Sequence, residues 1–217
     1  MSRMKYLLQR EISNLKGLTF REKAAYIWEY YKITVSVLGL ILVLAVTGTA
    51  FYSGRGKTAM YMVLVNAAEQ EENPITEMLQ KAEIIPAGHE VEVEDSYRLS
   101  MENSGTADPS TVQVLAALFS AGDMDLFAAD EQVYQRYAGQ DGFEDLSLYL
   151  SEDLLKAHEA DLYYATVDGG QILSGIWLRQ GSPLHQAGYY SEDVIIGITA
   201  HAVNLDYAVK ALEYFLE

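Results

Sequence analysis

The feature that most constrains this chain is an uncharged run of twenty residues, from Ile33 to Tyr52. As an α-helix rising about 1.5 Å per residue, the run would span ~30 Å, the thickness of a bilayer's hydrocarbon core. Eleven of its residues are Leu, Ile, Val or Phe, and each favours membrane insertion by about 0.3–0.6 kcal/mol. We therefore predict a single transmembrane helix over residues 33–53.

The charges on the two sides of this run set the expected orientation. Residues 1–32 carry seven Lys/Arg and three Glu, whereas residues 53–217 carry eight Lys/Arg and 28 Asp/Glu, a net charge of −20. Because basic flanks stay in the cytoplasm, we expect a cell-membrane protein with a cytoplasmic N-terminus and an extracytoplasmic C-terminal domain. The alternative is a cleaved signal peptide, since Gly48-Thr49-Ala50 has the small residues of a cleavage site, although the apolar run is long for one.

Residues 1–32 have the pattern of amphipathic helices beside the membrane. In the first helix, apolar residues at helical spacing alternate with basic ones, which favours a position on the anionic inner leaflet. A capping box then predicts that a second helix starts at Thr19, with Glu22 reaching back to the Thr19 amide. The alternative is that these helices pack on the cytoplasmic side of a partner protein. The apolar residues of the first stripe are Met4, Leu7, Leu8, Ile12 and Leu15.

After a linker over residues 54–58, residues 59–217 are numerous enough for one folded domain with its own core. Three strand–helix units come first, and they favour a parallel sheet with right-handed crossovers. Short helical pieces, a hairpin around Gly169-Gly170, another strand and a closing helix follow. We predict an α/β fold: one three-layer domain with a mostly parallel, mixed sheet. The expected strands are 59–66, 89–97, 125–129, 162–168, 171–179 and 194–200, and the expected helices 74–82, 109–121, one that follows the cap Asp130 and carries Val133, Tyr134 and Tyr137, 143–150, 151–158 and 204–216.

Three stretches of this domain resemble the extracytoplasmic solute-binding proteins of ABC transporters, which have the two-lobed type II periplasmic-binding fold. Residues 117–127 resemble the family's helix–Gly-Asp–strand passage, with Gly122-Asp123 at its centre. Residues 130–150 resemble the segment after it, and 194–216 resemble the late strand and helix that complete the first lobe. Together these stretches cover about half of the outer domain, and their motifs are degenerate.

The chain departs from this family in ways that bear on function. The family has a second lobe between these blocks, where this chain has only about 40 residues, largely the Gly169-Gly170 hairpin. Without a second lobe, no hinge can close a cleft around a solute. The resemblance therefore implies a one-lobe, membrane-anchored relative. The absence of cysteine means that no disulfide supports the domain, which suits the outer face of many Gram-positive anaerobes.

Candidate ligand-binding residues follow from the expected parallel strands, because ligands of open α/β sheets gather at the carboxyl ends of strands. Asn66, Ser100 and Asp130 occupy those ends. The simpler interpretation of Asp130 is that it only caps the helix that follows. Asp123 and Asp125 are two residues apart and would share one face of a strand, but a metal ion needs more ligands than these two, and we predict no metal site.

The remaining patterns argue against catalysis and nucleic-acid binding. The four histidines form no metal-binding pair, and no serine nucleophile motif or phosphate loop is present, so we predict no enzyme activity and no cofactor. A net charge of −20 disfavours nucleic acid. We expect the bilayer and another membrane or envelope protein as partners. The leading hypothesis is an extracytoplasmic binding or interaction module, and the alternative is a reduced solute receptor with a small ligand at the strand ends.

Overall fold

The computed structural model describes residues 57–99 and 109–217, together with Thr19, Arg21, Glu22, Trp28 and Val37. The chain divides into two compact units, Met1–Arg55 and Gly56–Glu217. Among the described residues, no helix is both long enough and apolar enough to cross a membrane. The predicted transmembrane run lies outside them except for Val37, as do the first predicted amphipathic helix and most of the second.

In the first unit, the described residues include the predicted capping box. Glu22 Oε2 accepts hydrogen bonds from the backbone N–H and from the hydroxyl of Thr19, both at 2.8 Å. The bond from the Thr19 N–H lowers the pKa of the exposed Glu22 carboxyl below its ordinary value. The prediction that Glu22 reaches back to the Thr19 amide is therefore confirmed.

In the second unit, the described residues form one six-stranded sheet with the order β2-β1-β3-β6-β5-β4. The pairs β1–β2 and β1–β3 are parallel, whereas β3–β6, β6–β5 and β5–β4 are antiparallel. The mixed α/β sheet is confirmed, but parallel pairing is confined to its β2-β1-β3 half. The strands are β1 (Lys57–Leu64), β2 (His89–Glu94), β3 (Leu126–Ala129), β4 (Leu162–Val167), β5 (Gly170–Leu178) and β6 (Val194–Ile198).

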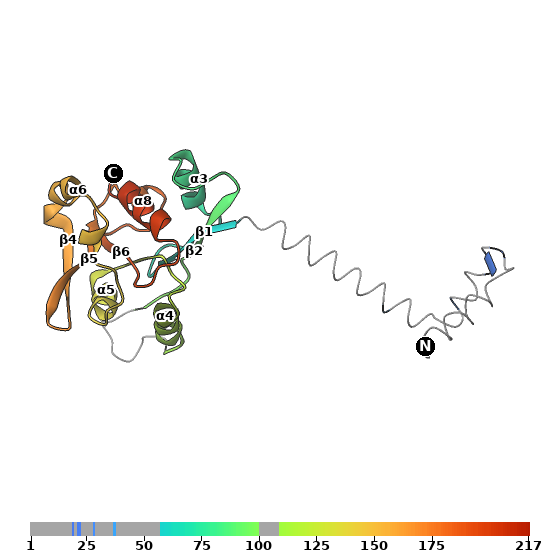
Figure 1. The fold of residues 1–217 in the computed structure, drawn as a ribbon, viewed down its shortest axis with the longest axis horizontal. Coiled ribbons are helices and arrows are strands. Elements are labelled where there is room, and N and C mark those ends of the chain that lie inside the picture. The colour runs from blue at the N-terminus through green and yellow to red at the C-terminus, as the bar shows by residue number, and fades with distance from the viewer. Residues whose placement is uncertain (1–18, 20, 23–27, 29–36, 38–56, 100–108) are drawn as a thin grey trace, which may run out of the picture. The chain divides into compact units, whose positions relative to one another are not determined.

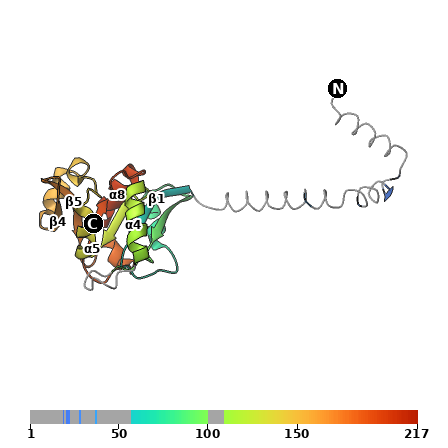
Figure 2. The same cartoon turned by 90° about the horizontal axis from the view of Figure 1, so that it is seen from below.

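Helices cover both faces of this sheet, which confirms the predicted three layers. Figure 1 shows α3 and α8 above the strands and α4 and α5 below them, and Figure 2, the view from below, has α4 in front. Alternate residues of β1 explain this arrangement, because Met60, Met62 and Leu64 pack in one core and Val63 in the other. The helices are α3 (Pro74–Lys81), α4 (Pro109–Ala121), α5 (Glu131–Ala138), α6 (Glu152–Ala157), α7 (Pro183–Gln186) and α8 (Leu205–Phe215), with 3₁₀ turns η1 (Leu146–Leu148) and η2 (Glu159–Asp161).

Several boundaries differ from the sequence predictions for identifiable reasons. Lys57 and Thr58, predicted as linker, pair with β2 and begin β1. The segment predicted as a helix over 143–150 contains only the short η1, because Phe143 forms a bridge with Thr199 at the sheet. Helix α7 was not predicted, although Pro183 stands at its first position.

The hairpin between β4 and β5 turns one residue earlier than predicted. Its two central residues are Asp168 and Gly169, with φ of 49° and 82°, and Val167 pairs with Gly170. A type I′ turn needs positive φ at both central positions, and Asp-Gly satisfies this requirement. The predicted Gly169-Gly170 turn was therefore wrong by one position, which moves the pairing register by two residues and leaves each side chain on the same face of the sheet.

Candidate functional site

The carboxyl ends of β1 and β3 border an open cavity of ≈ 700 Å³, a volume within the range of small-ligand pockets. The connection from β5 to β6 forms the opposite wall. Both Asn66 and Asp130, two of the three residues predicted from sequence, line this cavity. The lining residues are Asn66, Ala67, Ala68, Arg98, Asp130, Gly188, Tyr189, Tyr190, Ser191, Glu192, Asp193 and Val194.

Asn66 joins three segments at the floor of this cavity. Its side-chain amide donates to Asp130 Oδ2 and to the Leu99 carbonyl, each at 2.7 Å, and its Oδ1 accepts from the Leu99 N–H at 2.8 Å. The backbone of Asn66 has φ of 60°, a left-handed conformation that asparagine tolerates better than most residues. The Asn66 amide is thus bonded on both its nitrogen and its oxygen, and it positions neighbours more than it offers free donors.

Asp130 combines the two roles that the sequence left open. Its Oδ1 accepts from the Val133 N–H at 3.1 Å and caps α5, while its Oδ2 accepts from Asn66. Each carboxylate oxygen has a second lone pair, so Asp130 retains acceptor capacity toward the cavity. Ser100, the third predicted residue, lies outside the described residues, and its neighbour Leu99 bonds to Asn66.

Tyr190 is a residue of this site that the sequence analysis missed. Its hydroxyl lies 3.1 Å from the Val65 carbonyl oxygen and 3.0 Å from that of Ala128, at the ends of β1 and β3. Burial raises the pKa of Tyr190 well above its ordinary value, and the nearby Asp130 carboxylate raises it further. Tyr190 therefore stays protonated and donates to the strand ends, which fixes the β5–β6 connection against the sheet.

Further polar contacts hold the same connection in place. Asp193 accepts from Arg179 Nη1 at 2.9 Å and from the Gln180 N–H at 3.0 Å. The hydrogen bond from Arg179 holds the pKa of the Asp193 carboxyl below its ordinary value, so that the carboxylate is ionised at neutral pH. On the opposite rim, the exposed Arg98 is 3.3 Å from Glu69. The cavity is thus a preformed and mainly acidic site with one guanidinium at its edge.

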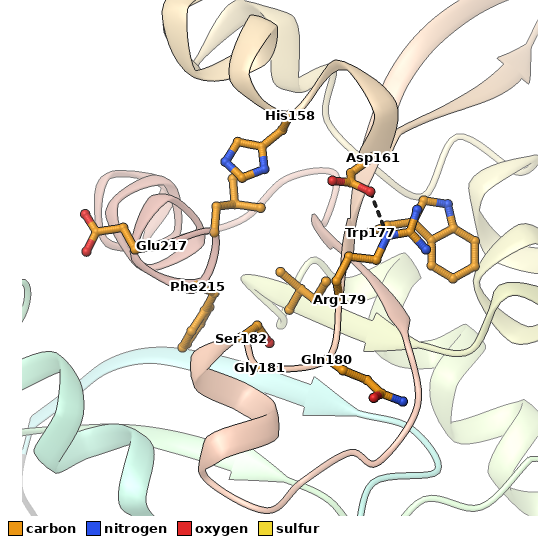
Figure 3. Close-up of a pocket in the computed structure, with 11 residues that line it drawn as sticks. His158, Asp161, Trp177, Arg179, Gln180, Gly181, Ser182, Phe215 and Glu217 are labelled. Atoms are coloured by element: carbon orange, nitrogen blue, oxygen red, sulfur yellow. Dashed lines mark hydrogen bonds and ion pairs between the residues drawn. The ribbon is translucent and has the colours of Figure 1, made fainter.

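A second, smaller cavity of ≈ 280 Å³ lies beside the end of α8 (Figure 3). Arg179 dominates its chemistry, with Nε 2.7 Å from Asp161 Oδ1 and the guanidinium carbon 5.2 Å from the centroid of the Trp177 ring. Because the same guanidinium also bonds to Asp193, its charge is already matched by two carboxylates. The strand-end cavity is therefore the stronger candidate for binding.

Of the two acidic residues considered for a metal ion, Asp125 accepts hydrogen bonds from other parts of the domain instead. The Asp125 carboxylate accepts from the Tyr61 N–H and from two N–H groups of Asn204, while Asp123 is exposed. Within the part of the chain that the structure describes, no three His, Asp or Glu side chains gather closely enough to hold a metal ion.

Comparisons with protein-family models, with curated proteins and with solved structures find no match for this chain.

Proposed function

We propose that this protein is a membrane-anchored extracytoplasmic binding or interaction module, built like one lobe of an ABC-transporter solute-binding protein. The observation that carries the proposal is the open cavity at the carboxyl ends of β1 and β3, where the side chains of Asn66 and Asp130 meet. Ligands of open α/β sheets bind at such strand ends. The uncharged run over residues 33–52 supplies the anchor in this proposal.

The place of β6 and α8 supports the one-lobe interpretation. After the hairpin, the chain returns to pair β6 with β3 in the middle of the sheet, and α8 packs on the same core. A strand and helix that complete a first lobe would occupy these positions, with the strand inside the sheet and the helix packed on one of its faces. The hairpin itself extends the sheet as β4 and β5. In this interpretation no second lobe closes over the strand-end cavity, which favours an interaction module over a solute receptor.

The anchor and its orientation are tested by adding protease to intact cells that carry a tag at each end of the protein. We expect the C-terminal tag and the acidic domain to be digested, while the tag before residue 33 stays protected. The control is the same treatment after the cells are made permeable, when both tags should be lost. Protection of both tags on intact cells, or a mature protein that begins near Phe51, would contradict the proposed topology.

A reduced solute receptor is the second candidate, and the volume of the strand-end cavity favours it. A thermal-shift screen of the full-length protein with amino acids, sugars and metal ions separates the two functions. A receptor should be stabilised by one compound class, and if that class carries a carboxylate, Arg98→Gln at the exposed rim should reduce the shift without changing the unfolding temperature of the free protein. If no compound shifts the transition, while crosslinking in membranes yields one dominant protein, the receptor is excluded and the interaction module is supported.

A further inference from the structure

The two edges of the sheet differ in how they resist pairing with another chain. Strand β2 closes one edge and carries three carboxylates on alternate positions, Glu90, Glu92 and Glu94. Charged side chains of this kind protect an edge from additional strands. Strand β4 closes the other edge with the sequence LYYATV, which has neither charge nor proline. Figure 1 shows β4 at the outer limit of the domain, beside β5. The second edge therefore lacks the protection of the first.

The backbone of β4 offers pairing groups toward this open side. In a two-residue hairpin, the closing pair, Val167 with Gly170, exchanges both hydrogen bonds, and the pattern alternates from there. Tyr164 and Thr166 consequently direct their N–H and C=O groups away from β5. Their side chains are exposed as well, with Tyr164 at 54% of its full accessible surface. Four backbone groups thus form a ready ladder for one more strand.

The charges around β4 indicate what kind of strand would fit. Acidic residues stand at both ends of the uncharged stretch, with the exposed Glu159 before it and Asp168 after it, while Asp161 is already paired with Arg179. A second copy paired antiparallel on the same edge would bring these acidic ends together, in addition to the repulsion between two highly acidic domains. A segment with an uncharged centre and basic ends would instead meet opposite charges at both ends.

We propose that the β4 edge binds an extended segment of a partner protein, which adds a seventh strand and has Lys or Arg on both sides of an uncharged, β-branched centre. Backbone hydrogen bonds to Tyr164 and Thr166 would supply affinity, and the flanking carboxylates would select basic segments. This surface is separate from the strand-end cavity, so each proposal can fail without the other.

The test measures the binding of labelled synthetic peptides to the full-length protein in non-ionic detergent by fluorescence anisotropy. The probe alternates Thr and Val over five residues with two Lys at each end, and matched peptides carry two Glu at each end or have alternate backbone nitrogens methylated. We expect the Lys peptide to bind at least about tenfold more tightly than either control, with an affinity that falls as salt rises. Equal binding of the methylated peptide would show attraction by charge alone and would overturn the proposal.

Two kinds of variant test the position of the binding strand. Thr166→Pro removes an N–H that points away from β5, so it should weaken the Lys peptide about tenfold or more while the hairpin ladder is kept. Because proline can also disturb folding, Tyr164→Lys and Tyr164→Glu form a second pair: the lysine should weaken the basic peptide and the glutamate should not. Unchanged binding of the Lys peptide to both Thr166→Pro and Tyr164→Lys would overturn the proposal. Dimers that form with rising protein concentration and that Thr166→Pro abolishes would also overturn it, because they would show that a second copy of this chain occupies the β4 edge.

Discussion

Replacing Gly197 with alanine should destabilise the domain by about 3–5 kcal/mol, a large part of the stability of a typical domain. A Cβ at this position of β6 would overlap the Tyr134 hydroxyl and lie 2.5 Å from the Ser174 carbonyl oxygen. The hydroxyl donates to that same carbonyl at 2.6 Å, inside the core formed by α5 and the sheet. The methyl group would therefore separate a buried hydrogen-bonded pair as well as overpack the core. Urea unfolding of the full-length protein in detergent measures the change.

Two further variants separate the close approach from a general effect of alanine. Gly139→Ala at the end of α5 is the matched control, since its nearest neighbour would be the Gln135 carbonyl oxygen at 3.6 Å, an ordinary contact. Its stability should stay the same or rise by up to ~1 kcal/mol. Adding Tyr134→Phe to Gly197→Ala should restore part of the loss, because it removes one of the two clashing oxygens. A loss in Gly197→Ala no larger than in Gly139→Ala would contradict the packing described for Tyr134.

Local sequence signals predicted most of the elements because each signal acts over a few residues. Asp130 was expected as a helix cap, and Asn73, Asp130 and Ser151 each accept a hydrogen bond from an N–H of the helix that follows. The alternation of Val91 with glutamates is typical of a half-exposed strand, and β2 lies within the predicted range 89–97. Helix caps and side-chain periodicity depend on residues that are close in the sequence, and long-range contacts do not override these local signals in this domain.

Long-range pairing was much harder to predict. Nothing in the residues 194–198 indicates that β6 lies between β3 and β5 and antiparallel to both, because that position depends on contacts with strands far away in sequence. The apolar faces of a buried strand look alike for parallel and antiparallel neighbours. The parallel sheet inferred from three strand–helix units was therefore correct only where those units pair with each other, in β2-β1-β3.

The candidate site was predicted in part for the same reason. Strand direction alone was enough to place Asn66 and Asp130 at the carboxyl ends of strands, and the pairing of β1 with β3 brings the Asn66 amide nitrogen to 2.7 Å from Asp130 Oδ2. Tyr190 was missed because it reaches the ends of β1 and β3 from a connection more than sixty residues away along the chain. A tyrosine in an irregular segment carries no sequence signal that distinguishes a surface ring from one that bonds to strand ends.

Asp125 should be the most sensitive carboxylate of the domain, and Asp125→Ala should cost about 3–5 kcal/mol. The residue is 2% exposed, and its Oδ2 accepts from the Tyr61 N–H at 2.8 Å while its Oδ1 accepts from the Asn204 N–H at 2.7 Å. Asn204 is the residue before α8, so the carboxylate also lies near the positive end of that helix. Alanine would leave two backbone N–H groups without their acceptor and would loosen β1 from the start of α8.

The exposed Asp123, two residues earlier, provides the matched control. Asp123→Asn should change the free energy of unfolding by no more than about 0.5 kcal/mol, whereas Asp125→Asn should lose an intermediate amount because an amide keeps only one acceptor oxygen. Urea unfolding of all three variants under one buffer gives the order Asp125→Ala, Asp125→Asn, Asp123→Asn from the largest loss to the smallest. Equal losses at positions 123 and 125 would show that the buried carboxylate does not join β1 to α8. The expected order would instead identify Asp125 as a structural residue that holds the sheet and its last helix together.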